Sequence, residues 1–340
     1  MIGDHYPSVS LHNVAELAAP EWTADGDQLC RVPASVGAKL NVSARERVRG
    51  PTNSELRFVP DGDDVEIEIT LSAADRTRVW PFWGEFRPWE PFEIGPEPET
   101  HAFSVPERLA RLEADAGADA GRFDPRVCRL RFERAPSVAL HGVSGDCRPP
   151  TADELPERRY LAYGTSITEG AASSAPHLNY VSHVARGIDA DVLNFGCSGS
   201  AYCEPAMADY LASRDDWDVA TLALSVNMAN RGFTVEQFRE RADYFVNRIA
   251  AAHPEKPIAC VTLFPYFADV IEGGDAQRAA DFRAALREVV ADSSHDTLSL
   301  VEGAELMELT GLAADLLHPG DTGMEAIGEG LAAHLESRLE

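Results

Sequence analysis

Ser166, His318 and Asp315 are residue types that together can perform nucleophilic catalysis. A serine hydroxyl attacks a carbonyl when a neutral imidazole takes its proton, and a carboxylate can hold that imidazole in the required tautomer. Asp315 precedes His318 by three residues, which on a loop lets the carboxylate fold back towards the ring. We therefore predict acyl transfer with Ser166 as the nucleophile, His318 as the general base and Asp315 as the residue that orients the base.

Hydrogen-bond donors to the oxyanion of the tetrahedral intermediate are a further requirement of this chemistry. We expect them to be the backbone amides of Ser166 and Gly199 and the side-chain amide of Asn227. Gly199 has no Cβ, so a substrate can approach its N–H closely. Taken alone, His318 has an ordinary explanation as a loop histidine and Asp315 as a helix cap. Together the residues fill every role, which favours the catalytic interpretation.

Each of these residues follows a segment with the pattern of a buried strand. The carboxyl ends of parallel strands lie along one edge of a sheet, and ligands of open α/β sheets bind at that edge. Strand patterns alternate here with helical patterns, which predicts a doubly wound, five-stranded parallel sheet. The predicted strands are 160–163, 191–195, 219–226, 258–263 and 298–301, and the predicted helices are 179–187, 205–213, 235–252, 276–291 and 322–339.

The first half of the chain alternates apolar and polar residues in short segments separated by turn signals. This period of two predicts an all-β sandwich of jelly-roll type. A proline-rich connector at 148–156 marks a boundary, so we predict a β accessory domain at 1–150 and a catalytic domain at 157–340. The segment 80–89 holds three of the five tryptophans. It is interpreted either as packed sandwich core, which we favour, or as an exposed strip that stacks on sugars.

Four short blocks of the second half carry a family resemblance. They are Gly164-Thr165-Ser166-Ile167-Thr168, Asn194-Phe195-Gly196-Cys197-Ser198-Gly199, Val226-Asn227 and Asp315-Leu316-Leu317-His318-Pro319. These blocks resemble those of the SGNH (GDSL-type) hydrolase superfamily of esterases and acylhydrolases, whose sheet is flavodoxin-like. The resemblance implies that Ser166 is the nucleophile, that Asp315 and His318 complete a triad, and that Gly199 and Asn227 help form the oxyanion hole. The first half is similar to the jelly-roll domain that precedes the catalytic domain in some carbohydrate esterases.

The blocks depart from the family pattern at two places. Thr165 stands before the serine where the family usually has Asp. That position is not the triad acid, so we expect little effect on the chemistry. The third block reads Ser225-Val226-Asn227-Met228, whereas the family usually has Gly-x-Asn-Asp. This departure keeps the asparagine but bears on the loop geometry and the class of substrate.

Other polar residues of the second half have competing structural explanations. Ser174 and His177 are three residues apart, but no third group supports them as a dyad. Cys197 is better interpreted as small apolar filling than as a nucleophile. Glu169 either touches the site or faces water. Structural roles are also expected for the histidines on or beside predicted helices, which are His177, His183 and His253.

The charge balance limits the environment and the partners. The chain has 56 acidic and 30 basic residues, a net charge of −26, and only two lysines, Lys39 and Lys256. Such a surface predicts adaptation to concentrated salt, and it argues against nucleic acid as a partner. We find no apolar run that could span a membrane and no signal peptide, so a cytoplasmic protein without membrane contact is expected. The six cysteines match no metal or disulfide pattern and are expected to be free thiols, mostly buried.

These observations predict a serine esterase or acylhydrolase that acts through an acyl-enzyme. The expected substrate is a small-molecule ester, in which a small acyl group such as acetyl is joined to a carbohydrate or another polar alcohol. No metal or organic cofactor is expected, and a homo-oligomer is left open. Two alternatives stay open as well: an acyltransferase on the same fold, and a non-catalytic carbohydrate-binding protein whose β domain does the binding.

Overall fold

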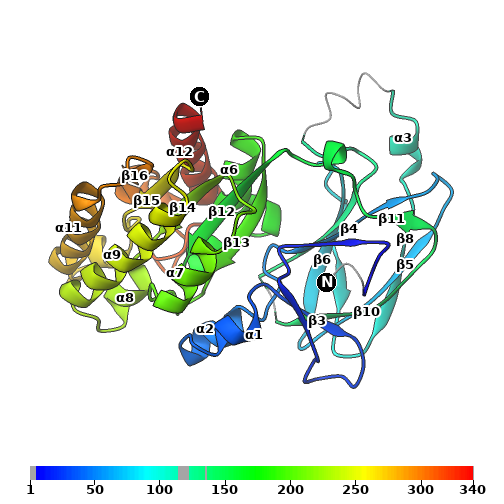
Figure 1. Ribbon diagram of the computed structural model, residues 1–340, viewed down its shortest axis with the longest axis horizontal. Helices are drawn as coiled ribbons and strands as arrows, with labels where there is room; N and C mark the ends of the chain where they lie inside the picture. The colour runs from blue at the N-terminus through cyan, green and yellow to red at the C-terminus, as the bar shows by residue number, and fades with distance from the viewer. Residues whose placement is uncertain (1–4, 114–121, 135, 340) are drawn as a thin grey trace. The chain divides into compact units, whose positions relative to one another are not determined.

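The computed structural model describes residues 5–113, 122–134 and 136–339 (Figure 1). They form two compact units. The first unit takes in the chain up to Ala34 together with Val48–Glu157, and the second takes in Ser35–Arg47 together with the chain from Arg158 onwards.

Two antiparallel β-sheets pack face to face in the first unit. Ile69 and Leu71 of one sheet share a core with Leu56 and Phe58 of the other, and all four side chains are fully buried. The prediction of an all-β sandwich is confirmed. One sheet has the order β1 (Ser10–His12), β4 (Glu55–Pro60), β9 (Cys128–Phe132), β6 (Thr77–Trp83) and β7 (Phe92–Ile94), with β11 (Cys147–Arg148) beside β4. The other has the order β2 (Glu16–Ala18), β3 (Asp27–Cys30), β10 (Val138–Ser144), β5 (Ile67–Ala73) and β8 (Glu99–Phe103).

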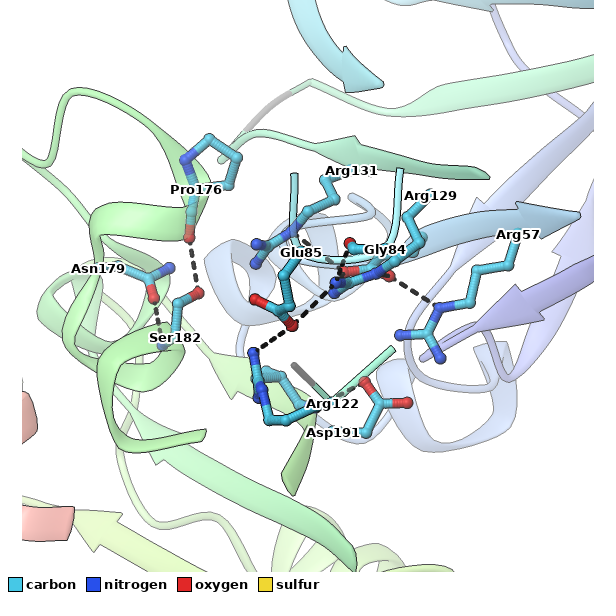
Figure 2. Close-up of polar contacts among 12 residues, drawn as sticks. Arg57, Gly84, Glu85, Arg122, Arg129, Arg131, Pro176, Asn179, Ser182 and Asp191 are labelled. Carbon is cyan, nitrogen blue, oxygen red and sulfur yellow. Dashed lines mark hydrogen bonds and ion pairs between the residues drawn. The ribbon is translucent and has the colours of Figure 1, made fainter. Parts of the chain in front are cut away.

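A buried charge cluster lies on β4 and β9. The carboxylate of Glu55 lies 2.8 Å from Arg57 Nε, 2.7 Å from Arg129 Nη2 and 3.0 Å from Arg131 Nε; Figure 2 shows the three arginines. Burial raises the pKa of the Glu55 carboxyl, but the three guanidinium groups outweigh it and hold that pKa well below its usual value. The cluster therefore keeps its charges paired in the interior of the unit.

The tryptophan-rich segment is mostly core. Trp80, Phe82 and Trp83 of β6 are buried, as expected for a packed strand. Trp89, beyond the end of that strand, is 91% exposed. The favoured interpretation therefore holds for β6, and Trp89 alone among the three tryptophans presents its ring to solvent.

Five parallel strands form the sheet of the second unit, as predicted. Their order is β13 (Ala190–Gly196), β12 (Arg158–Gly164), β14 (Val219–Ala223), β15 (Ile258–Val261) and β16 (Leu298–Val301). Gly164 and Gly196 lie opposite each other at the carboxyl ends of β12 and β13. All five residues of β14 are buried. This explains its nearly all-apolar sequence, because a central parallel strand is covered on both faces.

Helices cover both faces of this sheet (Figure 1). Tyr160 and Ala162 of β12 share a core with α6 (Tyr180–Gly187) and α12 (Asp321–Leu339). Tyr163 points to the opposite face, where its ring stacks on Phe245 with the centroids 4.4 Å apart. The doubly wound arrangement is thus confirmed. The second face carries α7 (Pro205–Ala212), α9 (Val235–Ala252) and α11 (Ala276–Asp292).

Short helices begin just beyond three of the strands. They are α5 (Ser166–Glu169) after β12, α8 (Val226–Asn230) after β14 and α10 (Phe267–Val270) after β15. Of these, α5 and α8 place Ser166 and Asn227 at the carboxyl edge of the sheet. Of the helices in the described ranges, none combines the length and the hydropathy that a membrane crossing requires.

Residues 35–47 belong to the second unit, although the predicted domains of 1–150 and 157–340 placed them in the first. They include α2 (Val42–Arg47) and most of α1 (Ala34–Gly37). The side-chain amide of Asn41 donates to Glu204 Oε1 at 2.6 Å and to the carbonyl of Ser200 at 3.0 Å. Asn41 also caps α2, because its Oδ1 accepts the N–H of Ala44. These contacts attach residues 35–47 to the loop that follows β13.

Candidate active site

Ser166 is the first residue of α5, directly after the turn that ends β12. The side chain of Thr165 accepts the N–H of Ile167 and caps the helix. Gly164 is required by packing, since a Cβ there would lie 2.1 Å from Thr168 Oγ1 and 3.0 Å from the carbonyl of Ala223. The sharp turn thereby places the Ser166 hydroxyl at the sheet edge.

Ser166, His318 and Asp315 form one continuous chain of hydrogen bonds. Ser166 Oγ lies 2.8 Å from His318 Nε2, and His318 Nδ1 lies 2.6 Å from Asp315 Oδ2. The carboxylate can only accept, so Nδ1 carries the proton and Nε2 is free to accept the serine proton. The sequence prediction that these three residues converge agrees with this geometry.

The carboxylate of Asp315 is held in place by the backbone. Its Oδ1 accepts the N–H groups of Leu317 and His318, each at 3.0 Å. Burial raises the pKa of the Asp315 carboxyl, but the hydrogen bonds from the His318 side chain and from these two amides outweigh it and lower the pKa. The carboxylate therefore stays ionised at neutral pH and fixes the tautomer of His318.

The loop that carries Asp315 and His318 is closed on itself. Leu312 and Pro319 form an isolated antiparallel bridge, and the N–H of Ala313 donates to the carbonyl of His318 at 2.8 Å. Leu316, between the two catalytic candidates, has φ of +52°. These contacts turn the chain sharply enough to bring a carboxylate and an imidazole three residues apart into contact.

Gly199 and Asn227 are connected through one loop. Gly199 has φ of +66°, and its carbonyl accepts the hydroxyl of Tyr202 at 3.1 Å. Asn227 Oδ1 accepts the N–H of Ala201 at 3.1 Å. Because its oxygen is engaged, the amide nitrogen of Asn227 is the end that remains to donate to a ligand. The loop after β13 and the start of α8 are thereby held together.

A buried network locks the serine turn to the neighbouring strand. Asn194 Nδ2 donates to the carbonyl of Thr168 at 2.6 Å, and Asn194 Oδ1 accepts the N–H of Gly196 at 2.8 Å. A Cβ on Gly196 would lie 2.6 Å from the backbone nitrogen of Glu169. Asn194 and Tyr202 had no predicted role. A polar amide near the end of a mainly apolar strand, at the start of the second family block, was the sequence signal for Asn194.

The rival serine and histidine both have structural surroundings. The hydroxyl of Ser174 donates to Asp321 Oδ2 at 2.6 Å, so this serine is tied to the first residue of α12. His177 lies in a single turn, Pro176–Leu178, whose first carbonyl accepts the hydroxyl of Ser182 at 2.8 Å (Figure 2). His177 is buried. Structural roles for both residues agree with the expectation.

The remaining rivals are also structural. Cys197 is buried, as are four more of the six free cysteines, and Cys147 is partly exposed. His253 lies against Trp217, with ring centroids 4.6 Å apart, and bonds the carbonyl of Ala212. Glu169 is 3% exposed, so the alternative that it faces water is wrong.

The comparisons with known proteins place this geometry in a family. The model of the GDSL-like lipase/acylhydrolase family matches residues 157–336. The chain therefore belongs to the GDSL-like lipase/acylhydrolase family. This membership supports an enzyme that hydrolyses esters or transfers acyl groups. No curated protein matches the chain.

Solved structures similar to this chain cover both of its units. The salicylyl-acyltransferase SsfX3 from a tetracycline biosynthetic pathway has a TM-score of 0.74 at 13% identity, over 97% of this chain and 96% of that one. A family two carbohydrate esterase from Clostridium thermocellum has a TM-score of 0.63 at 16% identity, over 97% of this chain and 99% of that one. An acetyl xylan esterase from Butyrivibrio proteoclasticus has a TM-score of 0.57 at 11% identity, over 98% of this chain and 96% of that one. At these identities the likeness shows a shared fold.

Ser225 is one of the positions at which the chain departs from the family pattern. It stands where the family usually has glycine, and its φ is +95°. This conformation is readily adopted by glycine and is strained for a residue with a Cβ. Its hydroxyl donates to the carbonyl of Leu224. The third block therefore keeps the backbone turn that a glycine would provide and stores strain beside Asn227.

We expect Ser225→Gly to be more stable than Ser225→Ala. Both variants lose the hydroxyl, but only Ala keeps the Cβ in the left-handed region, which costs roughly 1–2 kcal/mol. The greater backbone freedom of unfolded glycine offsets part of this, so we expect a difference of about 1 kcal/mol in the free energy of unfolding. Denaturant titration of both variants measures it. Equal stabilities would show that this turn is not strained.

Proposed function

We propose that the chain is a serine esterase that cleaves its substrate through an acyl-enzyme on Ser166. The observation that carries the proposal is the hydrogen-bonded chain from Asp315 through His318 to Ser166, with 2.6 Å and 2.8 Å between the bonding atoms. A serine at a strand end with an oriented base in contact is the arrangement that nucleophilic acyl transfer requires. Family membership supports the same reaction class.

The residues can divide the reaction as follows. Ser166 Oγ attacks the ester carbonyl while His318 Nε2 takes its proton, and the imidazolium returns that proton to the departing alcohol. Water then attacks the acyl-enzyme with His318 again as base, which releases the acid and restores the serine. Asp315 stabilises the imidazolium in both steps because its lowered pKa keeps it ionised.

The oxyanion of each tetrahedral intermediate needs donors aimed at it. We assign the backbone N–H groups of Ser166 and Gly199 and the Nδ2 amide of Asn227 to this task. Ala201 supports the assignment of Asn227, since its N–H binds the amide oxygen and leaves Nδ2 as the end that faces a ligand. Tyr202 supports the assignment of Gly199, since its hydroxyl binds the Gly199 carbonyl and helps to fix the loop.

We further propose a small acyl group, such as acetyl, on a carbohydrate or another polar alcohol as the substrate. The likeness to a family two carbohydrate esterase and to an acetyl xylan esterase, across both units, supports this choice. In the first unit, the exposed ring of Trp89 offers a surface of the kind on which sugars stack.

An acyltransferase on the same fold is the second candidate. The likeness to a salicylyl-acyltransferase over 97% of the chain favours it. Both reactions share the acyl-enzyme and differ in the acceptor, which is water in one and a second alcohol in the other. Product analysis with an added alcohol distinguishes them, because transfer yields a new ester and hydrolysis yields free acid.

A fluorophosphonate probe is expected to label the protein at Ser166. The probe reacts with serines that have an activated hydroxyl, so Ser166→Ala should lose the label. The matched control is Ser174→Ala, which removes the rival hydroxyl bound to Asp321 and should keep the label. Labelling is read by peptide mass spectrometry in molar KCl, because the acidic surface predicts salt adaptation. Folded protein without label would contradict a serine hydrolase and favour the binding-protein alternative. Unchanged labelling of Ser166→Ala would show that Ser166 is not the nucleophile.

Substrate preference provides a separate prediction. We expect kcat/KM on p-nitrophenyl esters to be highest for acetyl and to fall as the acyl chain lengthens, and we expect acetylated sugars to release acetate. Rates on the ester series and acetate release from the sugars are the measurements. A clear preference for long acyl chains would contradict the proposed substrate while leaving the serine mechanism in place.

A further inference from the structure

Arg231 lies beside the predicted oxyanion hole. It directly follows the last residue of α8 and comes four residues after Asn227, so the two share one face of that helical turn. A Cβ built on Gly199 would lie 3.5 Å from Arg231 Nη2, with no other heavy atom among its near neighbours. The guanidinium thus faces the open side of the glycine whose N–H is assigned to the oxyanion, at a distance where a side chain on that glycine would touch it.

The segment that carries Arg231 is fixed at both ends by other arginines. Arg278 donates to the carbonyls of Ala229 and Phe233, which bracket Arg231. The guanidinium of Arg241 lies over the ring of Phe233, 5.1 Å from its centroid. The backbone around Arg231 is thereby held from two sides, and its side chain is exposed to solvent.

Arg241 and Phe233 also contact the loop after β13, which carries Gly199. Arg241 Nη1 donates to the carbonyl of Tyr202 at 3.1 Å, and the rings of Tyr202 and Phe233 lie 5.0 Å apart. The Tyr202 hydroxyl in turn holds the Gly199 carbonyl. Gly199 and Arg231 therefore belong to one constrained surface, which a ligand would meet as a unit.

Several arginines of the second unit form ion pairs with carboxylates. Arg283 pairs with Asp269 at 2.7 Å and Arg287 with Glu302 at 2.6 Å. In the described ranges, no carboxylate lies within ion-pair distance of Arg231.

We propose that Arg231 binds a carboxylate of the substrate, so that the enzyme favours esters that carry a negative charge near the reacting carbonyl. The inference rests on the proposed esterase function and names a substrate class for that site. A guanidinium matches a carboxylate with two parallel hydrogen bonds. In a strongly acidic protein, a cation at the site also offsets the repulsion that an anionic substrate would meet.

The test compares neutral and anionic esters on wild type, Arg231→Gln and Arg231→Lys. The neutral ester is p-nitrophenyl acetate. Mono-p-nitrophenyl succinate carries the carboxylate on the acyl side, and 4-acetoxybenzoate carries it on the alcohol side. We expect Arg231→Gln to lower kcat/KM by roughly 10- to 100-fold for at least one anionic ester, the loss typical of a hydrogen-bonded charge, and by less than about threefold for the neutral one. Arg231→Lys should keep part of the rate on the anionic ester, because lysine keeps the positive charge but lacks the paired N–H donors of the guanidinium.

Two controls separate this proposal from the esterase proposal. Arg186→Gln removes an exposed arginine on α6 and should change none of the rates. The affinities of 4-acetamidobenzoate and acetanilide, which resist hydrolysis, are measured by calorimetry. They test the role of Arg231 without turnover. Wild type should bind the anion more tightly than the neutral amide, and Arg231→Gln should not.

Two outcomes would overturn the proposal. Equal losses on neutral and anionic esters would show that Arg231 acts on the oxyanion or on the loop. Unchanged rates and unchanged binding of the anion would show an ordinary surface side chain. Failure of Ser166 to react with the fluorophosphonate would instead defeat the esterase proposal, while the calorimetry would still decide on Arg231.

Discussion

The hydrogen bond between Ser166 Oγ and His318 Nε2 joins two positions 152 residues apart. The bond brings the turn after β12 together with the loop that precedes α12. The tight turn at Gly164 places the serine, and the closed loop between Leu312 and Pro319 places the histidine. Asp315 then sets the tautomer from within the same loop. A shift in either turn would break this contact, so the geometry of both turns is the main constraint on the site.

Close backbone approach is the means by which the site is kept rigid. Gly164 and Gly196 lie opposite each other in register, and a Cβ at either position would collide with α5. Asn194 adds two hydrogen bonds between the same segments. The serine turn is therefore fixed by the two strands on which it rests. Pre-organisation of this kind lowers the cost of reaching the transition state, because the groups need not reorient during the reaction.

Much of this arrangement could be predicted from the sequence, because it follows from strand ends. Apolar runs such as that of β14 identified the parallel sheet, and the residues after each run identified Ser166, Gly199 and Asn227 as candidates. The spacing of Asp315 and His318 required only a sharply turned loop, which Leu316 provides with its positive φ.

Other features depend on contacts between distant residues, which carry no local pattern. The attachment of residues 35–47 to the second unit rests on Asn41 meeting Glu204 and Ser200. The role of Tyr202 rests on a hydroxyl that reaches a carbonyl three residues back. Ser225 could be noticed as a departure, but the strain behind it needed a backbone angle. The position of Arg231 over Gly199 likewise appears only when α8 and the loop after β13 are placed side by side.

The central claim is that Ser166 becomes acylated with His318 as its base, and the most direct test is mass spectrometry of rapidly quenched reactions with an activated acetyl ester. We expect a transient acetyl adduct on the peptide that contains Ser166. In His318→Ala, that adduct should form more slowly by roughly 10²–10⁴-fold, the usual contribution of a general base. Turnover without an adduct on Ser166, or an adduct whose rate does not depend on His318, would show that Ser166 and His318 do not have these roles.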